Sequence, residues 1–219
     1  GSCGPGWGNG KATAVQFGRE GATVFCVDID LGAARETTDI IEKEGGRCAS
    51  FEGDVADRQA VEGMVSGCVD EFGRIDILHN NVGIIELGGA VETSEESWDR
   101  VLDVNLKSMF LTCKFAIPHM LNQGGGAIVN IASSVGIRWH GVAYISYATT
   151  KAAIIQFTKV VAMEYAAKNI RCNCILPGFI NTPLVRASLT NAYAGVNFDE
   201  VVAARDAQIP MGKMGEAID

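Results

Sequence analysis

A tyrosine and a lysine lie four positions apart in the segment YISYATTKAA, residues 144–153. On a helix Tyr147 and Lys151 share one face, whereas Tyr144 has Ala148 at that spacing. A phenol with a pKa near 10 is a poor base at neutral pH, and lowering that pKa by about 3 requires roughly 4 kcal/mol. A positive charge about 4 Å away supplies a similar amount at an effective dielectric constant near 20. The pair predicts an acid–base group, although this spacing also occurs by accident on amphipathic helices.

Two serines follow the apolar segment GAIVNIA, residues 126–132, whose composition predicts a strand. Open α/β sheets bind ligands at the carboxyl ends of their strands, which is where Ser133 and Ser134 stand. A serine hydroxyl there can hold the reacting oxygen of an alcohol or carbonyl against Tyr147. Both serines are candidates for this role.

Four glycines alternate with other residues at the start of the chain: Gly4, Gly6, Gly8 and Gly10. Such a run can be a frayed terminus that binds nothing. Here an amphipathic helix over 11–20 follows, then a strand over 22–27 with Asp28 at its tip. A glycine turn at a helix N-terminus suits a pyrophosphate, and an acid at the next strand tip can accept hydrogen bonds from the adenosine ribose. The arrangement predicts a dinucleotide site.

The acid at the strand tip also selects between the two nicotinamide cofactors. Asp28 could instead cap the next helix, but Asp30, directly before LGAARETTDIIEKEG, fits that role better. A carboxylate at this place repels the 2′-phosphate of NADP, and no Arg or Lys follows within the next few positions. We therefore expect NAD.

Short β-branched runs alternate with longer amphipathic runs along the chain, the pattern of βαβ units. It predicts an α/β fold with a doubly wound, mostly parallel sheet of the Rossmann type, in a single domain over 1–219. An irregular stretch begins at Gly178, and we expect a substrate loop or lid over about 178–210. Strands are expected over 22–27, 47–53, 75–80, 126–132 and 170–176, and helices over 11–20, 32–44, 57–72, 95–121 and 146–168.

Composition excludes several classes of partner. The chain of 219 residues has a formal net charge of -8, and we find no cluster of Lys and Arg that would bind nucleic acid. No apolar run approaches the roughly 18 residues that span a bilayer. The seven cysteines lie mostly in apolar segments, which suits a reducing compartment and leads us to expect a cytoplasmic protein. Cys172 and Cys174 have no second pair, so no metal site is expected.

These segments, together with NNVG at 80–83 and PGFINTP at 177–183, resemble the short-chain dehydrogenase/reductase family over essentially the whole chain. Cys3 stands where the family usually has threonine, and Val82 where it usually has alanine. The resemblance implies that Tyr147 is the general acid/base and that Lys151 lowers its pKa and grips the nicotinamide ribose. It favours Ser133 as the serine that orients the substrate, because the strand fixes its position. Ser134 has the commoner spacing to the tyrosine and stays the alternative.

The resemblance also assigns further residues, each with a simpler structural alternative. Asn105 matches an asparagine that holds a water in the family's proton relay, or it bridges backbone within a helix. Asp54 flanks adenine, or it ends a strand, and Thr182 contacts the carboxamide, or it belongs to an ordinary turn. The expected cofactor contacts are Gly4, Gly6, Gly8, Asn9, Gly10, Asp28, Asp54, Val55, Asn81, Gly83, Tyr147, Lys151, Pro177, Ile180 and Thr182.

Three residues near these segments could line the substrate pocket or pack at a subunit contact: Trp139, His140 and Phe179. We expect His79 and His119 to be structural. The expected function is hydride transfer between NAD(H) and a secondary alcohol or ketone, which could be cyclic. The alternatives are a non-catalytic NAD-binding sensor or scaffold, and an epimerase or dehydratase, which accumulation of NADH would distinguish. The resemblance further implies a homo-dimer or homo-tetramer, joined through the helices over 95–121 and 146–168.

A phosphate-binding glycine turn normally follows a strand, yet only Gly1 and Ser2 precede Cys3. In the strand order 3-2-1-4-5-6 that strand lies in the middle of the sheet, between the strand ending at Asp28 and the strand ending at Asn80. Each backbone group that it leaves unpaired costs about 1–3 kcal/mol. We therefore expect at least one further strand before Gly1, and a helix and a strand after Asp219.

Overall fold

The computed structural model describes residues 6–185, 187 and 197–219. Its helices are α1 (Asn9–Arg19), α2 (Leu31–Lys43), α3 (Arg58–Phe72), α4 (Glu95–Leu102), α5 (Ser108–Asn122), α6 (Ile145–Tyr165) and α8 (Phe198–Asp206), with a π-helical turn η1 (Asp103–Lys107) and two 3₁₀ turns, η2 (Ser134–Gly136) and η3 (Ala166–Lys168). Its strands are β1 (Val24–Asp28), β2 (Cys48–Glu52), β3 (Ile77–Asn80), β4 (Gly126–Ile131), β5 (Ile170–Ile175), β6 (Ile180–Asn181) and β7 (Gly215–Glu216). The predicted α/β fold with parallel strands is confirmed.

All strand pairs of the ladders run parallel. β1 pairs with β2, β4 lies between β3 and β5, and β6 pairs with β7. The registers place Asp28 opposite Glu52, and Asn80 opposite Asn130. Because parallel strands end together, the segments that follow β1, β3, β4 and β5 open on one edge of the sheet.

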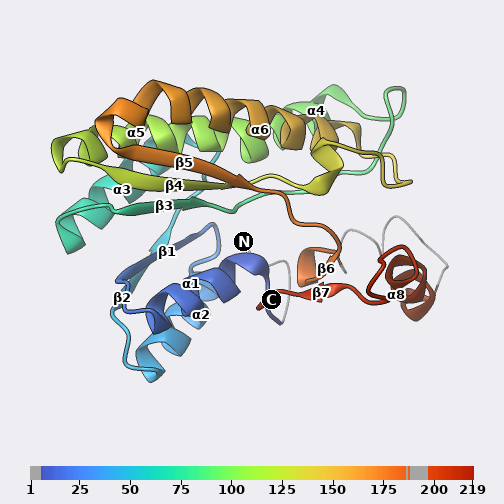
Figure 1. The fold of residues 1–219 in the computed structure, drawn as a ribbon, viewed down its shortest axis with the longest axis horizontal. Coiled ribbons are helices and arrows are strands. Elements are labelled where there is room, and N and C mark those ends of the chain that lie inside the picture. The colour runs from blue at the N-terminus through green and yellow to red at the C-terminus, as the bar shows by residue number, and fades with distance from the viewer. Residues whose placement is uncertain (1–5, 186, 188–196) are drawn as a thin grey trace.

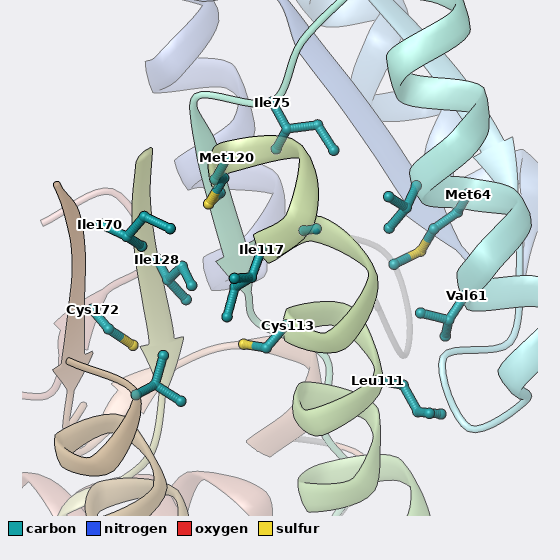
Figure 2. Packing of buried hydrophobic residues seen from close by; sticks show 13 residues of the cluster. Val61, Met64, Ile75, Leu111, Cys113, Ile117, Met120, Ile128, Ile170 and Cys172 are labelled. Carbon is teal, nitrogen blue, oxygen red and sulfur yellow. The ribbon is translucent and has the colours of Figure 1, made fainter. Parts of the chain in front are cut away.

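Helices cover both faces of the sheet. In Figure 1, α3, α5 and α6 lie on one side of β3–β5, and α1 and α2 lie on the other side, beside β1 and β2. The main core lies under α3 and α5. Figure 2 shows Cys113, Ile117 and Met120 of α5 facing Ile128 of β4 and Ile170 of β5. Burial of this apolar stripe, at roughly 25 cal/mol per Å², is what holds the helices on the sheet.

A gap separates β1 from β3. Among the described residues, no segment pairs with the open edge of either strand. A cavity of about 460 Å³ lies there, lined among others by Phe25 of β1, Leu78 and His79 of β3, and Phe17 of α1. Both ring nitrogens of His79 are buried without a hydrogen-bond partner in the described part of the chain, and burial lowers its pKa. This is the position at which the sequence predicts a further strand, and that strand stays a prediction.

Two expectations about the helices and loops differ from the structure. The single helix expected over 95–121 is interrupted by η1, whose extra residue makes Ser108 N–H donate to the carbonyl of Asp103, five residues back. The segment expected to be irregular from Gly178 contains the short strand β6, and α8 follows within the expected lid. Residues 186 and 188–196 of that lid lie outside the described residues. No helix in the described ranges is both long and apolar enough to span a bilayer.

Candidate active site

Buried asparagines fix the ends of two central strands. The side chain of Asn80, the last residue of β3, donates to Oδ1 of Asn130 on β4 at 2.9 Å and accepts from Thr112 on α5 at 2.8 Å. Asn130 in turn donates to Thr158 on α6 at 3.0 Å. A buried polar network with its members satisfied holds neighbouring elements in one arrangement. The network therefore fixes the positions from which the segments after β3 and β4 begin.

The glycine turn meets the loop after β3. Gly8 is the N-cap of α1, and a Cβ on Gly10 would lie 2.5 Å from Nδ2 of Asn81, closer than two such atoms approach. A side chain at position 10 would therefore displace the amide of Asn81 from its place beside α1. Gly6 has a φ of 117°, which also favours glycine, but it does not line the cavities described below. Gly4 and Cys3 lie outside the described residues.

Two neighbouring cavities, together called the cleft below, share lining residues along the carboxyl edge. Gly8 and Asn81 line both cavities, whose volumes are about 190 and 110 Å³. The first extends to Gly10, Asp28 and Val55. The second contains the other expected contacts: Asn9, Gly83, Ser133, Tyr147, Lys151, Pro177, Ile180 and Thr182. The expected nucleotide and reaction ends thus lie on either side of the glycine turn, as an elongated dinucleotide requires.

The charges at the nucleotide end sum to a negative value. Asp28 is 9% exposed and accepts a hydrogen bond from the backbone N–H of Asp30 at 3.1 Å, whereas Asp30 caps α2 as predicted. Lys11 also lines this cavity, but its Nζ lies 2.7 Å from Oε1 of Glu36. One ammonium and two carboxylates, those of Glu36 and Asp28, therefore lie at or beside this cavity.

The two residues expected beside adenine, Asp54 and Val55, lie in different surroundings. Val55 lines the nucleotide cavity, whereas Asp54 is exposed and is not among the lining residues. The Asp54 side chain accepts from the backbone N–H of Ala56 at 2.8 Å. The side chain of Asp54 therefore closes the turn between β2 and α3, and its expected contact with adenine stays a prediction.

Ser133 and Tyr147 meet at the reaction end. Burial raises the pKa of Tyr147 to about 12, while a hydrogen bond with the Ser133 side chain and the charge of Arg205 act in the opposite direction. Ser134 makes no such bond, and its buried hydroxyl has no partner within the described ranges. Ser133 lines both the cofactor cleft and the neighbouring cavity, whereas Ser134 lines only the latter. The geometry favours Ser133 for the orienting role.

Glycine at position 136 brings the serine turn against α6. A Cβ on Gly136 would lie 2.8 Å from the backbone N of Ala152 and from the carbonyl carbon of Lys151. Any side chain there would push η2 away from α6. This contact therefore keeps Ser133 within reach of Tyr147, one turn earlier on the same helix.

Lys151 is almost completely buried beside the tyrosine. Its Nζ donates to the carbonyl of Ile131 at 2.7 Å and lies 5.5 Å from the centre of the Tyr147 ring. Burial lowers the pKa of Lys151 to about 8. The expected lowering of the tyrosine pKa by Lys151 is not what the chain alone displays, because burial of the phenol dominates and the lowering comes from Ser133 and Arg205. Desolvation of the phenol, which the spacing of the two residues does not reveal, outweighs the attraction to nearby positive charge.

Asn105 lies in the π-helical turn and is fully buried. Its side chain accepts from Ile84 N–H at 2.8 Å and donates to Ile84 C=O at 3.0 Å and to Thr150 at 3.2 Å. It thereby fastens the loop after β3 to α6. A Cβ on Gly83 would lie 3.3 Å from Asn105 Oδ1 and 3.4 Å from Lys151 Nζ, so the amide and the ammonium face the same glycine.

A third cavity, of about 80 Å³, opens beside the two hydroxyl groups. Ser133 and Tyr147 line it together with two of the expected substrate residues, His140 and Phe179. Trp139 is 72% exposed and does not line it. Arg205 of α8, which was not among the expected site residues, also lines this cavity. No local pattern signals it, because only the tertiary path of the segment after β5 brings α8 here.

Metal ligands do not gather in the described part of the chain. The described residues contain no group of three or more His, Cys, Asp or Glu side chains that could hold an ion, and the six described cysteines are free thiols. Burial raises the pKa of the Cys26 and Cys113 thiols to about 12. These thiols are therefore protonated and pack as small apolar groups.

Comparisons with known proteins identify the family of this chain. Residues 3–192 match the family described as short chain dehydrogenase. A 3-oxoacyl-[acyl-carrier-protein] reductase of Thermotoga maritima is 38% identical over 213 residues, 95% of this chain and 81% of the relative. A cyclohexanol dehydrogenase of Acinetobacter sp. (strain SE19) is 40% identical over 184 residues, 83% of this chain and 72% of the relative.

The structural comparison gives the same answer. A crystal structure of a protein from Burkholderia xenovorans superimposes with a TM-score of 0.91 at 46% identity, and the match covers 100% of this chain and 82% of that chain. The sequence and the fold therefore indicate the same family. The chain belongs to the short-chain dehydrogenase/reductase family and is an oxidoreductase that acts on a CH–OH group.

Proposed function

We propose that this protein transfers a hydride between NAD(H) and a secondary alcohol or ketone. The observation that carries the proposal is that Ser133, Tyr147 and Lys151 line one end of a cleft whose other end holds Asp28 and the glycine turn. A protein that only bound the cofactor would need no acid–base group beside an apolar substrate cavity. The two relatives are named for a cyclic alcohol and for an acyl ketone, so both stay candidates for the substrate class.

The cleft fits a nicotinamide dinucleotide by its donors and its glycines. Gly8 lines both cavities, and a Cβ there would project into open space, so the backbone can approach a pyrophosphate at the N-terminus of α1. Asp28 would accept from the adenosine ribose, and Lys151 and Tyr147 would hold the nicotinamide ribose. The carboxylate of Asp28 at the tip of β1 favours NAD over NADP, because a carboxylate there would repel the 2′-phosphate of NADP. When bound, the oxidised nicotinamide supplies the hydride acceptor and a positive charge.

Side chains of the protein would transfer the proton of the substrate hydroxyl. In oxidation the Ser133 hydroxyl holds the substrate oxygen, and the Tyr147 phenolate takes the proton from the substrate hydroxyl as the C–H hydride leaves. In reduction Tyr147 returns that proton to the oxygen. Lys151 would hold a positive charge near the phenolate, and Asn105 keeps the adjacent loop and α6 together through its bonds to Ile84 and Thr150.

Turnover with matched cofactors tests the proposal. We expect a panel of secondary alcohols, including cyclohexanol, to produce NADH faster than NADPH when the purified protein is supplied with NAD⁺ or NADP⁺. Binding of NADH without turnover of any alcohol or ketone would instead support a sensor. Conversion of substrate without net NADH would indicate an epimerase or dehydratase.

We also propose that the protein is a homo-oligomer joined through its long helices. Phe110 of α5 and Val160 and Met163 of α6 are 51%, 53% and 81% exposed, and apolar side chains gathered on helices are typical of subunit contacts. Light scattering on the protein as it elutes from a size-exclusion column should give the mass of a dimer or a tetramer. A monomeric mass at micromolar concentration would exclude this proposal.

A further inference from the structure

An imidazole lines the cavity beside the two reacting hydroxyl groups. His140 shares this cavity of about 80 Å³ with Ser133 and Tyr147, and most of the other described residues in its wall are apolar, Leu87 and Val142 among them. Ser133 and Tyr147 already supply the groups that hold the reacting oxygen and move its proton. A further polar ring in this wall is therefore available for another part of the substrate.

Two contacts hold the imidazole of His140 in place. Its Nε2 lies 3.3 Å from Nε of Arg138, and its ring meets the Phe179 ring edge to face, with 4.9 Å between the ring centres. Arg138 is not among the described residues that line the cavity, so Nε2 is bound by a residue outside the wall. The two contacts together limit the rotation of the imidazole and keep it beside the cavity.

The contact with Arg138 also decides which ring nitrogen carries the proton. A guanidinium only donates hydrogen bonds, so Nε2 of His140 accepts and the neutral imidazole has its proton on Nδ1. Burial, followed by the charges of Arg138 and Arg205, lowers the pKa of His140 from its ordinary value of 6.5, so the ring is neutral near pH 7. No group in the described ranges forms a hydrogen bond with Nδ1. His140 therefore keeps one N–H donor for a ligand.

The size of the cavity limits where an acceptor for this donor can lie. An apolar void of about 150 Å³ takes one benzene ring, and the cavity beside Ser133 has only about 80 Å³. It has room for the reacting carbon and a few neighbouring atoms, and not for a long chain. An oxygen that accepts from Nδ1 of His140 must therefore be attached close to the reacting carbon.

We propose that His140 forms a second oxygen subsite, so that the alcohol or ketone turned over at Tyr147 carries another hydroxyl or carbonyl oxygen close to its reacting carbon. This inference rests on the proposed function, because it names the substrate class of the same site. The Nδ1–H of His140 would donate to the second oxygen while the Ser133 hydroxyl holds the reacting oxygen. The substrate class is a 1,2- or 1,3-diol, or the hydroxyketone or diketone of the same pattern.

Paired substrates that differ in one group test the subsite. We would compare cyclohexane-1,2-diol with 2-methylcyclohexanol, and cyclohexane-1,3-diol with 3-methylcyclohexanol, because a methyl group has nearly the size of a hydroxyl group and accepts no hydrogen bond. In at least one pair kcat/KM for the diol should exceed that for the methyl compound by about 5- to 150-fold, which corresponds to about 1–3 kcal/mol for a donor left unpaired. No preference for the diol in either pair would overturn the subsite.

Two variants of His140 separate the donor from the ring. His140→Phe keeps a ring against Phe179 and removes the N–H, so it should abolish the preference for the diol, mainly through KM. His140→Asn loses the ring but places an amide N–H close to the position of Nδ1, so it should retain part of the preference. A ring that only packs would give the opposite order, and that order would overturn the subsite. A change in the pKa of Tyr147 would act on both substrates of a pair and cancel in their ratio.

The matched control alters the neighbouring residue of the same loop. Trp139 is 72% exposed and is not among the described residues that line the cavity, so Trp139→Leu should keep the preference for the diol. An equal loss in Trp139→Leu and His140→Phe would mean that the loop as a whole sets the preference, which would contradict a role for the imidazole N–H.

A binding measurement separates this inference from the proposed function. Calorimetric titration of the protein with each diol and its methyl counterpart, in the presence of NADH, needs no hydride transfer. Tighter binding of a diol that His140→Phe abolishes would support the subsite even if no alcohol were oxidised, a result that would refute only the proposed function. Equal or absent binding of the diols and the methyl compounds would refute the subsite, whatever alcohols the protein oxidises.

Discussion

Replacing Lys151 with methionine should change how the stability of the protein depends on pH. Burial lowers the pKa of Lys151 from its ordinary value of 10.5 to about 8. Below both values the ammonium is charged in the folded and the unfolded chain. The pKa difference of about 2.5 then corresponds to a cost of about 3 kcal/mol, carried by the folded state.

The sign of the effect follows from where the proton is held. Between about pH 8 and 10.5 the unfolded chain binds more protons at this lysine than the folded chain, so this group makes the free energy of unfolding rise with pH. The methionine variant lacks the group. From about pH 7 to about pH 9.5 the unmodified protein should gain roughly 2 kcal/mol relative to Lys151→Met.

Urea denaturation of both proteins at the two pH values measures this gain. The difference between the two proteins isolates Lys151, because every other titrating group is common to both. The absolute offset at one pH also includes the unpaired carbonyl of Ile131, which loses its 2.7 Å hydrogen bond, so the test uses only the change with pH. A difference that stays constant over this range would show that Lys151 is not desolvated, and the account of its burial would fail.

Three further substitutions test the roles assigned at the site. Tyr147→Phe should lower kcat by at least about 100-fold, because it removes the acid–base hydroxyl, and should leave the affinity for NADH nearly unchanged in a fluorescence titration; substantial turnover would refute the mechanism. Ser133→Ala should lower kcat by roughly 100-fold or more and Ser134→Ala by far less, and the reverse order in steady-state kinetics would reassign the orienting role. Asp28→Ser should raise kcat/KM for NADP⁺ relative to NAD⁺, and an unmodified protein that already prefers NADP⁺ would contradict the assigned charge preference.

Features that depend on residues close together in the sequence could be predicted from the spacing of those residues. Tyr147 and Lys151 fall on one face of α6 because four residues make about one helical turn, and Asp30 caps α2 as its position indicated. The parallel strands followed from the alternation of short and long apolar runs. Other features of the site depend on how distant segments pack together, and a short stretch of sequence does not reveal this.

Three features could not be predicted for physical reasons. The π-helical turn needs one extra residue in a helical ladder, and propensity hardly distinguishes it from a continuous α-helix. The pKa of Tyr147 depends on how much water the whole fold removes, which the spacing to Lys151 does not reveal. Arg205 reaches the substrate cavity through the path of the chain after β5, so its role is tertiary in origin.

The π-helical turn at Asp103–Lys107 has a consequence for how the site tolerates insertion and deletion. An α-helix rotates by about 100° per residue, so removing one residue from the turn would let α4 and α5 join as a regular helix and would rotate one about the other. α5 is held by the core and by the bond from Thr112 to Asn80, so α4 would have to turn. The amide of Asn105 would then leave Ile84. One extra residue in the helix is therefore enough to direct this amide toward Ile84. A related sequence with a deletion at this place should hold its loop after β3 by other contacts.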